Sequence, residues 1–400
     1  MTPAEPSGRP ARRTGSGMRR ARRRDRRVYS FRHPVLFTLL TLTRGRPVRR
    51  LGGTVLIHSR DAFRDGLTRI PLDRSAAGTT GGAAGDLTGG GLLFDQDGDE
   101  HRGTRRALAD ALGADGVQRL RPVWTAVLDR RLAPLAGGAT IDLVDVAAEM
   151  AGATAAALLD LDADPHALAA AARAAAATAA REHLPGIPRP GLRRAARAAA
   201  ADLTALVAST GATGPAARPD GCPAGHPAPV AARDRVTDGV ALAAMLAVAA
   251  INTTVAALPR AAAWCADAGL WRYAETAPDA LTSELLRVTA PTPLLPRVAA
   301  APGTAGSCPV RRGDRLILVA RHAVDAHRTD PCPADPAPPQ IAQLVFGAGT
   351  HACPGARLAR RQLTDALRAL ARHRPRVVRA RVDRHGALPG WSRLILAATR

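Results

Sequence analysis

One cysteine, placed in a loop of small residues, is the strongest candidate for chemistry in this sequence. The loop runs from Phe346 to Gly355 with the sequence FGAGTHACPG, directly before a helical pattern. Pro354 fits the first turn of that helix, where the positive end of the helix dipole favours a thiolate over a thiol. Gly349 and Gly355 carry no side chain that would keep backbone amides or a flat ligand away from the sulfur. We therefore interpret Cys353 as a thiolate that ligates a metal.

The spacing of the loop residues matches a known motif. The pattern F-x-x-G-x-[RH]-x-C-x-G is met by Phe346, Gly349, His351, Cys353 and Gly355. On these residues the chain resembles the cytochrome P450 superfamily, in which a cysteine thiolate holds the iron of haem b. The resemblance implies that Cys353 is the iron ligand, that Phe346 packs near its sulfur and that His351 faces a haem propionate. The alternative is a buried structural cysteine, the commoner fate of a lone cysteine.

Two further segments resemble the parts of the family that hold the haem propionates. Residues 99–106, DEHRGTRR, are similar to a P-E-H-T-R-L-R-R helix, with His101 and Arg105 as the propionate ligands. Their i, i+4 spacing puts both side chains on one helix face, which suits the binding of two carboxylates. Arg297, in a predicted strand over residues 296–298, resembles a third propionate ligand. An exposed basic helix is the alternative for the first segment.

A long apolar helix is predicted from residue 234 toward residue 259, and it must be buried. Part of it follows the family pattern A-G-x-[DE]-T-T in register: Ala249, Ala250, Asn252, Thr253 and Thr254. The polar members need partners or a wet cavity. By resemblance, Thr253 would order the water used in oxygen activation and the two alanines would leave room over the iron. Asn252 replaces the family's acid, and back-bonding of the threonines to the previous turn is the alternative.

Glu284 and Arg287 match the family's E-x-x-R pair, which locks the core beneath the haem, and we interpret them as structural. An exposed pair at i, i+3 is the alternative. The arginine that completes this network in the family is missing from residues 331–336, and Arg328 is the substitute that the sequence offers.

The elements that must position these residues are mostly helical. Helices are predicted over residues 62–67, 117–138, 143–161, 165–181 and 190–209, with strands at 55–57 and 314–319. The two alanine-rich helices at 165–181 and 190–209 have few large side chains to hold them in place, which suits a lid. Residues 76–91 hold seven glycines and are predicted to be a flexible loop over the pocket. Residues 1–27 hold ten arginines and are predicted to be a disordered tail before a single catalytic domain at 28–400.

Composition excludes several classes of protein. The net charge of +22 comes from arginine alone, since the sequence has no lysine, and this looks like codon bias of a GC-rich genome. We therefore expect no nucleic-acid partner. Five scattered cysteines without a C-x-x-C pair indicate a reducing cytoplasm. The longest membrane candidate noted is Val35–Leu42, far short of roughly 20 residues, so we expect no membrane partner. A twin-arginine export signal is the less favoured alternative.

The resemblance implies a mainly α cytochrome P450 fold with a small β region. It also implies a haem b monooxygenase that oxidises a small, largely apolar molecule with O2 and electrons from ferredoxin and ferredoxin reductase, in secondary metabolism. Asn252 leaves open an atypical enzyme that uses peroxide, couples or rearranges rings, or acts as a reductase. The missing acid and the missing third arginine leave open a haem-binding companion protein without turnover.

Overall fold

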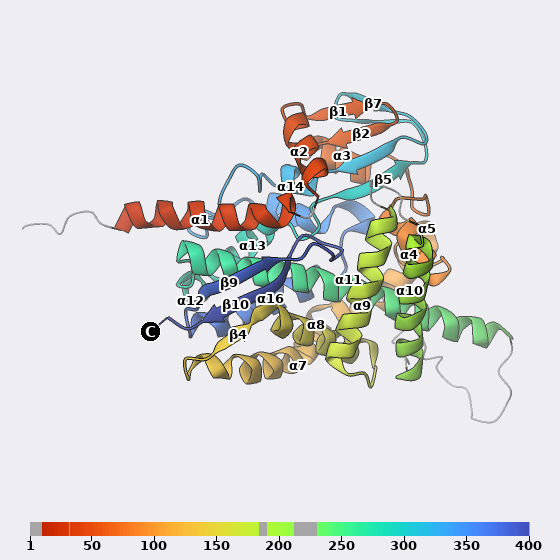
Figure 1. Cartoon of the computed structure of the whole chain (residues 1–400). Coiled ribbons are helices and arrows are strands. Elements are labelled where there is room, and N and C mark those ends of the chain that lie inside the picture. Colours follow the sequence, from red (N-terminus) through yellow and green to blue (C-terminus); the bar gives the residue numbers. More distant parts are fainter. Residues whose placement is uncertain (1–9, 32, 184–189, 212–229, 400) are drawn as a thin grey trace, which may run out of the picture.

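A single long helix, α11 (Val230–Ala268), runs through the middle of the fold (Figure 1). The structure, a computed structural model, describes residues 10–31, 33–183, 190–211 and 230–399. The sequence predicted that this helix would stop near Pro259, but it continues for nine more residues. Leu258, Ala261 and Cys265 are almost fully buried around the proline. Their packing therefore outweighs the one backbone hydrogen bond that proline removes.

Helix α11 is also the described segment most like a membrane span. Residues 238–268 are long and apolar enough to cross a bilayer, with a mean hydropathy of 2.0, and 56% of the tested window is buried. The sequence expectation that Val35–Leu42 was the longest candidate is therefore wrong. Helices α1 (Pro10–Ser30), α8 (Leu143–Leu159), α9 (Pro165–His183) and α16 (Ala356–Ala371) pack against α11, so its place in the core accounts for its apolar composition.

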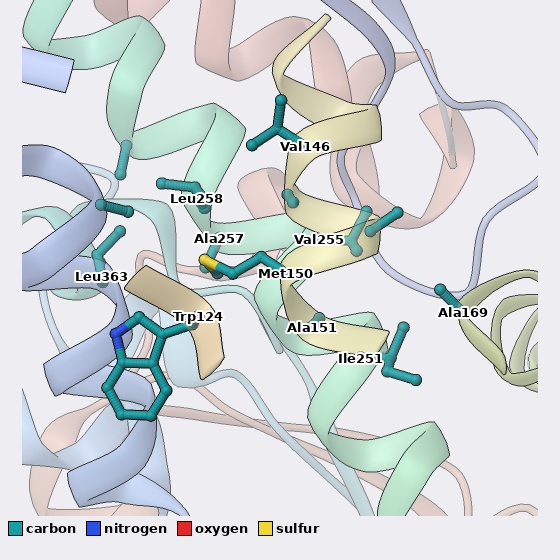
Figure 2. Packing of buried hydrophobic residues seen from close by; sticks show 14 of the residues in the cluster. Trp124, Val146, Met150, Ala151, Ala169, Ile251, Val255, Ala257, Leu258 and Leu363 are labelled. Atoms are coloured by element: carbon teal, nitrogen blue, oxygen red, sulfur yellow. The ribbon is translucent and has the colours of Figure 1, made fainter. Parts of the chain in front are cut away.

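The main core lies among α7, α8, α11 and α16, with α7 packed on α8 and α16, and these two packed on α11. Met150 of α8 points toward Ala257 and Leu258 of α11 (Figure 2). The buried indole of Trp124 on α7 donates a hydrogen bond of 3.1 Å to Asp365 on α16. The helices of this region are α5 (Gly98–Ala107), α6 (Ala109–Leu112), α7 (Ala114–Leu132), α8 (Leu143–Leu159), α9 (Pro165–His183), α10 (Leu192–Ser209), α12 (Tyr273–Thr276), α13 (Pro278–Thr289), α15 (Pro339–Ala342) and α16 (Ala356–Ala371). The mainly α fold with a small β region is confirmed.

Strands β1, β2 and β5 lie at one end of the molecule, whereas β4, β9 and β10 lie among the helices (Figure 1). A five-stranded sheet has the order β1-β2-β8-β5-β3, in which only the β2/β8 pair is parallel. A three-stranded sheet has the order β4-β10-β9, and β6 and β7 form a hairpin. The strands are β1 (Val48–Leu51), β2 (Thr54–Ile57), β3 (Leu72–Asp73), β4 (Thr140–Asp142), β5 (Leu295–Ala299), β6 (Gly303–Ala305), β7 (Cys308–Val310), β8 (Arg315–Leu318), β9 (Arg376–Val382) and β10 (Trp391–Ala397). Helices α2 (Pro34–Thr43), α3 (Arg60–Thr68) and α14 (Ala320–Ala323) lie beside the first sheet.

The prediction that residues 10–27 are disordered is wrong, because they belong to the helix α1 (Pro10–Ser30), which packs against α11. Ala21, Asp25 and Val28 repeat at helical spacing and are at most 4% exposed. A narrow stripe of this kind is hidden by the surrounding arginines when only composition is considered. Residues 1–9 lie outside the described residues.

A buried ion pair fixes α1 to the centre of the fold. Arg260 of α11 donates to both carboxylate oxygens of Asp25, at 2.8 and 3.0 Å, and to the hydroxyl of Tyr29 at 2.6 Å. The Tyr29 hydroxyl donates onward to the Thr289 carbonyl at 2.6 Å. Burial alone would lower the pKa of Arg260, but Asp25 and Tyr29 outweigh it and raise the pKa. The pair therefore stays charged, and each partner depends on the other.

The glycine-rich segment at 76–91 is also more ordered than predicted, since it contains helix α4 (Thr80–Thr88). The Thr79 hydroxyl caps this helix by accepting from the Gly82 amide at 3.0 Å. A side chain at Gly81 would come within 2.0 Å of the Arg74 carbonyl, so the glycines there allow close packing. The prediction failed because glycine was interpreted as flexibility alone. The sequence also predicts proline-containing links at 183–188 and 211–229, and these lie almost entirely outside the described residues.

We predict that Arg260→Ala lowers the free energy of unfolding by about 3–5 kcal/mol, because it leaves the Asp25 carboxylate buried without its partner. Urea unfolding followed by circular dichroism would measure the loss. Arg22→Ala is the control, since Arg22 pairs with Asp330 at 2.6 Å nearer the surface and its loss should cost less than about 1 kcal/mol. Equal effects of the two changes would contradict the role assigned to the buried pair.

Candidate active site

The Cys353 loop has a fixed backbone shape that joins a short helical turn to α16. Gly347 and Gly349 take positive φ values of 79° and 74°, in the left-handed region that favours glycine. The Cys353 amide donates to the Phe346 carbonyl at 2.8 Å, which closes the loop. A side chain on Gly349 would lie 3.1 Å from Thr68 on α3. Gly349 is therefore needed for the backbone conformation of the loop. It does not line the cavity, contrary to the sequence prediction that it leaves room for a flat ligand.

The Cys353 thiol faces a cavity and is surrounded by protein on its other sides. Cys353 is exposed and is one of the residues that line the cavity. Burial raises the pKa of the thiol, while the Gly355 amide and the guanidinium groups of Arg105 and Arg360 oppose that rise. The predicted anion-stabilising groups are thus present but do not outweigh burial. A metal cation at the sulfur would supply the missing positive charge.

The cavity has a volume of about 540 Å³ and a largely apolar wall. It collects residues from α2, α4, α9, α10 and α11 above the Cys353 loop. Most site residues predicted from the sequence line it: His101, Arg105, Ala249, Ala250, Asn252, Thr253, Thr254, Arg297, Phe346, His351, Cys353 and Gly355. The alanine-rich helices α9 and α10 contribute to its wall, and their motion as a lid stays a prediction.

Cations gather at one end of this cavity. The rings of His101 and His351 stack with centroids 4.0 Å apart, and Arg105 donates to the Ala352 carbonyl at 2.6 Å. The Nε atom of Arg297 is buried without a hydrogen-bond partner among the described residues. Burial, and then nearby Arg74, lowers the pKa of Arg297 to about 10. Arg74 also lines the cavity, but it belongs to no motif and was not predicted from the sequence.

The two histidines at this end are neutral near neutral pH. Burial, and then Arg74 and His101, lower the pKa of His351 to about 4, although Asp97 lies 3.4 Å from its Nε2 atom. Burial, followed by Arg105, also lowers the pKa of His101. This end of the cavity therefore has more hydrogen-bond donors and arginine cations than carboxylates to pair with them.

These features fit a haem. Its iron would meet the cavity-facing sulfur of Cys353, and its two propionates would supply carboxylates for the arginines and imidazoles at the basic end. The orphaned Nε atom of Arg297 is the clearest sign, because a buried donor without an acceptor costs about 1–3 kcal/mol. The apolar wall matches the apolar faces of the macrocycle.

The polar residues of α11 face the cavity but are already hydrogen-bonded. Asn252 donates from Nδ2 to the Val248 carbonyl at 2.8 Å and to the Ala172 carbonyl of α9 at 3.3 Å. Thr253 donates to the Ala249 carbonyl at 2.9 Å, as the back-bonding alternative predicted. Thr253 also lines the cavity, so its position is compatible both with back-bonding to the previous turn and with a role in ordering water.

Glu284 and Arg287 form a buried pair outside the cavity, with two hydrogen bonds of 2.8 and 2.6 Å. Glu284 also accepts from the backbone amides of Cys332 and Ala337, at 2.9 and 3.0 Å. Burial acts to raise the pKa of Glu284, but Arg287 and these amides hold it below its usual value.

Backbone groups therefore take the place of the missing third arginine. Arg287 also donates to the Asp330 carbonyl at 3.1 Å and to the Thr329 hydroxyl at 2.8 Å. Arg328 is exposed, and the contacts of the described residues do not join it to Glu284. The suggestion that Arg328 substitutes is therefore wrong.

We predict that Glu284→Ala costs about 3–5 kcal/mol of folding free energy, because it leaves the buried Arg287 charge and two half-buried amides without their partner. Thermal melting and the yield of soluble protein would show the loss. Asp279→Ala, at an exposed position in the first turn of the same helix, should cost less than about 1 kcal/mol. A Glu284→Ala protein as stable as that control would mean that the network is dispensable.

No family model matches the chain, and no curated protein is similar to it. Many solved structures are similar. A mutant of P450 EryK in complex with erythromycin B has a TM-score of 0.71 and 20% identity, covering 91% of this chain and 96% of that chain. P450BioI in complex with a ligated acyl carrier protein has a TM-score of 0.72 and 16% identity, covering 93% and 100%. CYP164A2 of Mycobacterium smegmatis has a TM-score of 0.68 and 24% identity, covering 90% and 94%. This chain therefore has the cytochrome P450 fold over nearly its whole length.

Proposed function

We propose that the protein is a haem-thiolate monooxygenase that oxidises a small or medium-sized, largely apolar molecule. The observation that carries the proposal is the thiol of Cys353 in the floor of an apolar cavity with an excess of cations at one end. When bound, haem would supply reductive activation of O2, and a thiolate ligand favours O–O cleavage. The remaining roles belong to residues of this chain.

Binding and orientation of the cofactor fall to the loop and the basic end of the cavity. Cys353 would ligate the iron, and Phe346 beside it carries the guanidinium of Arg360 at 4.7 Å over its ring. Arg105 and Arg297 would bind the propionates, with the neutral imidazole of His101 as a further donor. Gly355 brings no side chain within contact of the sulfur.

Above the cofactor, α11 would shape the reaction space. Ala249 and Ala250 present small side chains to the cavity. The hydroxyl of Thr253 donates its hydrogen to the Ala249 carbonyl, so its oxygen is left to accept a hydrogen bond from water. Thr253 would thus hold a water in place, with Thr254 beside it, and that water would carry the proton.

The atypical enzyme remains the second candidate, and Asn252 favours it. An amide does not titrate near neutral pH, and the two Nδ2 hydrogens of Asn252 have carbonyl acceptors on α9 and α11. Asn252 therefore works here as a link between two helices. Proton delivery must rely on water or on a carboxylate of the substrate, or the enzyme bypasses it by using peroxide, rearranging rings or reducing its substrate.

We further propose electron transfer from a ferredoxin and its reductase in the cytoplasm. Arg357 is exposed on α16 just after the Cys353 loop, with Arg360 and Arg361 on the same helix, which suits an acidic electron donor. Two of the similar structures support a place in secondary metabolism: P450 EryK in complex with erythromycin B, and the cytochrome P450 PksS of the Bacillus subtilis bacillaene polyketide synthase. A companion protein without turnover is the remaining alternative, and consumption of NADPH only in the presence of substrate would exclude it.

We predict that the purified protein binds haem b and that its reduced complex with CO shows the thiolate-specific absorption band. Cys353→Ser should abolish that band, because the hydroxyl of serine does not replace a thiolate ligand. Cys332→Ser, at an exposed position outside the cavity, should keep it. A band that survives in Cys353→Ser would overturn the assignment of the ligand.

We predict that Thr253→Ala increases the share of NADPH that ends as peroxide instead of product, because the water that it positions is lost. Loss of a positioned proton donor is worth roughly 10²–10⁴ in rate. Peroxide and product would be quantified with the first substrate that shifts the haem spectrum. Thr204→Ala, on the α10 wall of the cavity, is the control and should couple like the parent. If Thr253→Ala also couples like the parent, the atypical enzyme becomes the leading interpretation.

A further inference from the structure

Helix α2 carries an apolar stripe on the surface. Among the described residues, six large apolar side chains are exposed, and all but Val378 lie between residues 31 and 51. Phe31 is 46% exposed, Val35 82%, Leu39 40% and Leu42 78%. The spacing of four and three places Val35, Leu39 and Leu42 along one face of α2, and Phe31 lies in the turn between α1 and α2. A row of this kind is unusual on a protein surface that faces only water.

The opposite side of α2 is already used by the fold. His33, Leu36 and Phe37 line the cavity, and Leu40 packs against the first sheet beside which α2 lies (Figure 1). Only one side of α2 therefore packs its apolar side chains into the protein. The exposed stripe needs a separate explanation.

The surroundings of the stripe are basic. From residue 26 to residue 60 the sequence contains eight arginines and no acidic residue. Arg44, Arg46 and Arg49 are exposed, and among the described residues no carboxylate forms an ion pair with them. At the other end of the stripe, the guanidinium groups of Arg27 and Arg384 lie 5.6 and 5.5 Å from the ring centre of Phe31.

Acidic side chains that come from other segments do not neutralise this surface. Asp330 pairs with Arg22, Asp325 with Arg60 and Asp314 with Arg50, at 2.6 to 2.7 Å. Partial burial, and then the cations of Arg22, Arg321 and Arg44, lower the pKa of Arg26 although Asp330 opposes them. The region thus holds more positive charge than its own carboxylates balance.

The expectation of no membrane partner considered only segments that span a bilayer. We propose instead that the face formed by Phe31, Val35, Leu39 and Leu42, with Arg27, Arg44, Arg46 and Arg49 around it, docks on an anionic lipid surface. An aliphatic helix face with arginines at its margins matches a helix that lies in the plane of a membrane interface. A protein partner is less favoured, because valine, leucine and threonine are under-represented among the residues that dominate protein interfaces. A lipid surface needs no shape complementarity to an aliphatic row.

The test is co-sedimentation of the full-length holoprotein with vesicles made of equal parts of phosphatidylglycerol and phosphatidylcholine. We expect binding at low salt that weakens as salt is added, and little binding to vesicles of phosphatidylcholine alone. The double variant Val35→Ser/Leu42→Ser should bind at least about tenfold more weakly. Arg44→Gln/Arg46→Gln should lose about fivefold for each arginine removed.

Val378→Ser is the matched control, because Val378 is 49% exposed but lies on strand β9 and not on α2, and its loss should leave vesicle binding unchanged. Circular dichroism would establish that the double variants are folded. Failure of the parent to sediment with anionic vesicles at low salt would overturn the proposal. So would a stripe variant that binds vesicles normally but no longer dimerises, or no longer binds an acidic ferredoxin, since either result would assign the stripe to a protein partner.

Discussion

The need to cover a long apolar helix governs the architecture of this protein. Helix α11 presents apolar side chains around most of its circumference, so other elements must pack against it on several sides. The exception lies between Val248 and Thr254, where only Ile251 is fully buried and the remaining positions are half-buried. The cavity opens along that stretch. The proposed reaction site is therefore the place where the cover of the central helix is incomplete.

Buried arginines perform two different tasks in this chain, and the presence or absence of a carboxylate partner separates them. Arg260 and Arg287 are buried with bidentate carboxylate partners, and they hold α1 and the segment before the Cys353 loop in place. Arg297 is enclosed without such a partner. The planar guanidinium suits both tasks, because its fork of donors fits one carboxylate in a structural pair and a ligand carboxylate in the cavity. The two roles differ in the source of the carboxylate: the chain provides it for Arg260 and Arg287, whereas a ligand would provide it for Arg297.

The sequence could predict the parts of the site that depend on local spacing. The Cys353 loop, the His101 and Arg105 pair and the polar residues of α11 each lie within one segment, and the structure brings them to one cavity. Arg74 was missed because its position depends on packing between distant segments and on no local pattern. Likewise, backbone amides stabilise Glu284 where the family uses an arginine, and a search for side-chain motifs does not detect amides.

The wrong prediction that residues 10–27 of α1 are disordered has a physical cause, and that cause also affects how the protein folds. Its stripe of buried residues is narrow, and its key polar contact, from Asp25 to Arg260, joins residues that are 235 positions apart. Contacts between residues so far apart in sequence form late, because a long loop must be closed before they contribute any stabilisation. During synthesis α1 leaves the ribosome well before α11 is made. The arginines of α1 and the exposed face of α2 are therefore accessible to other molecules before α11 can pack against α1. A segment that is completed early is thus among the last to be fixed, and chaperones or early proteolysis would act on it first.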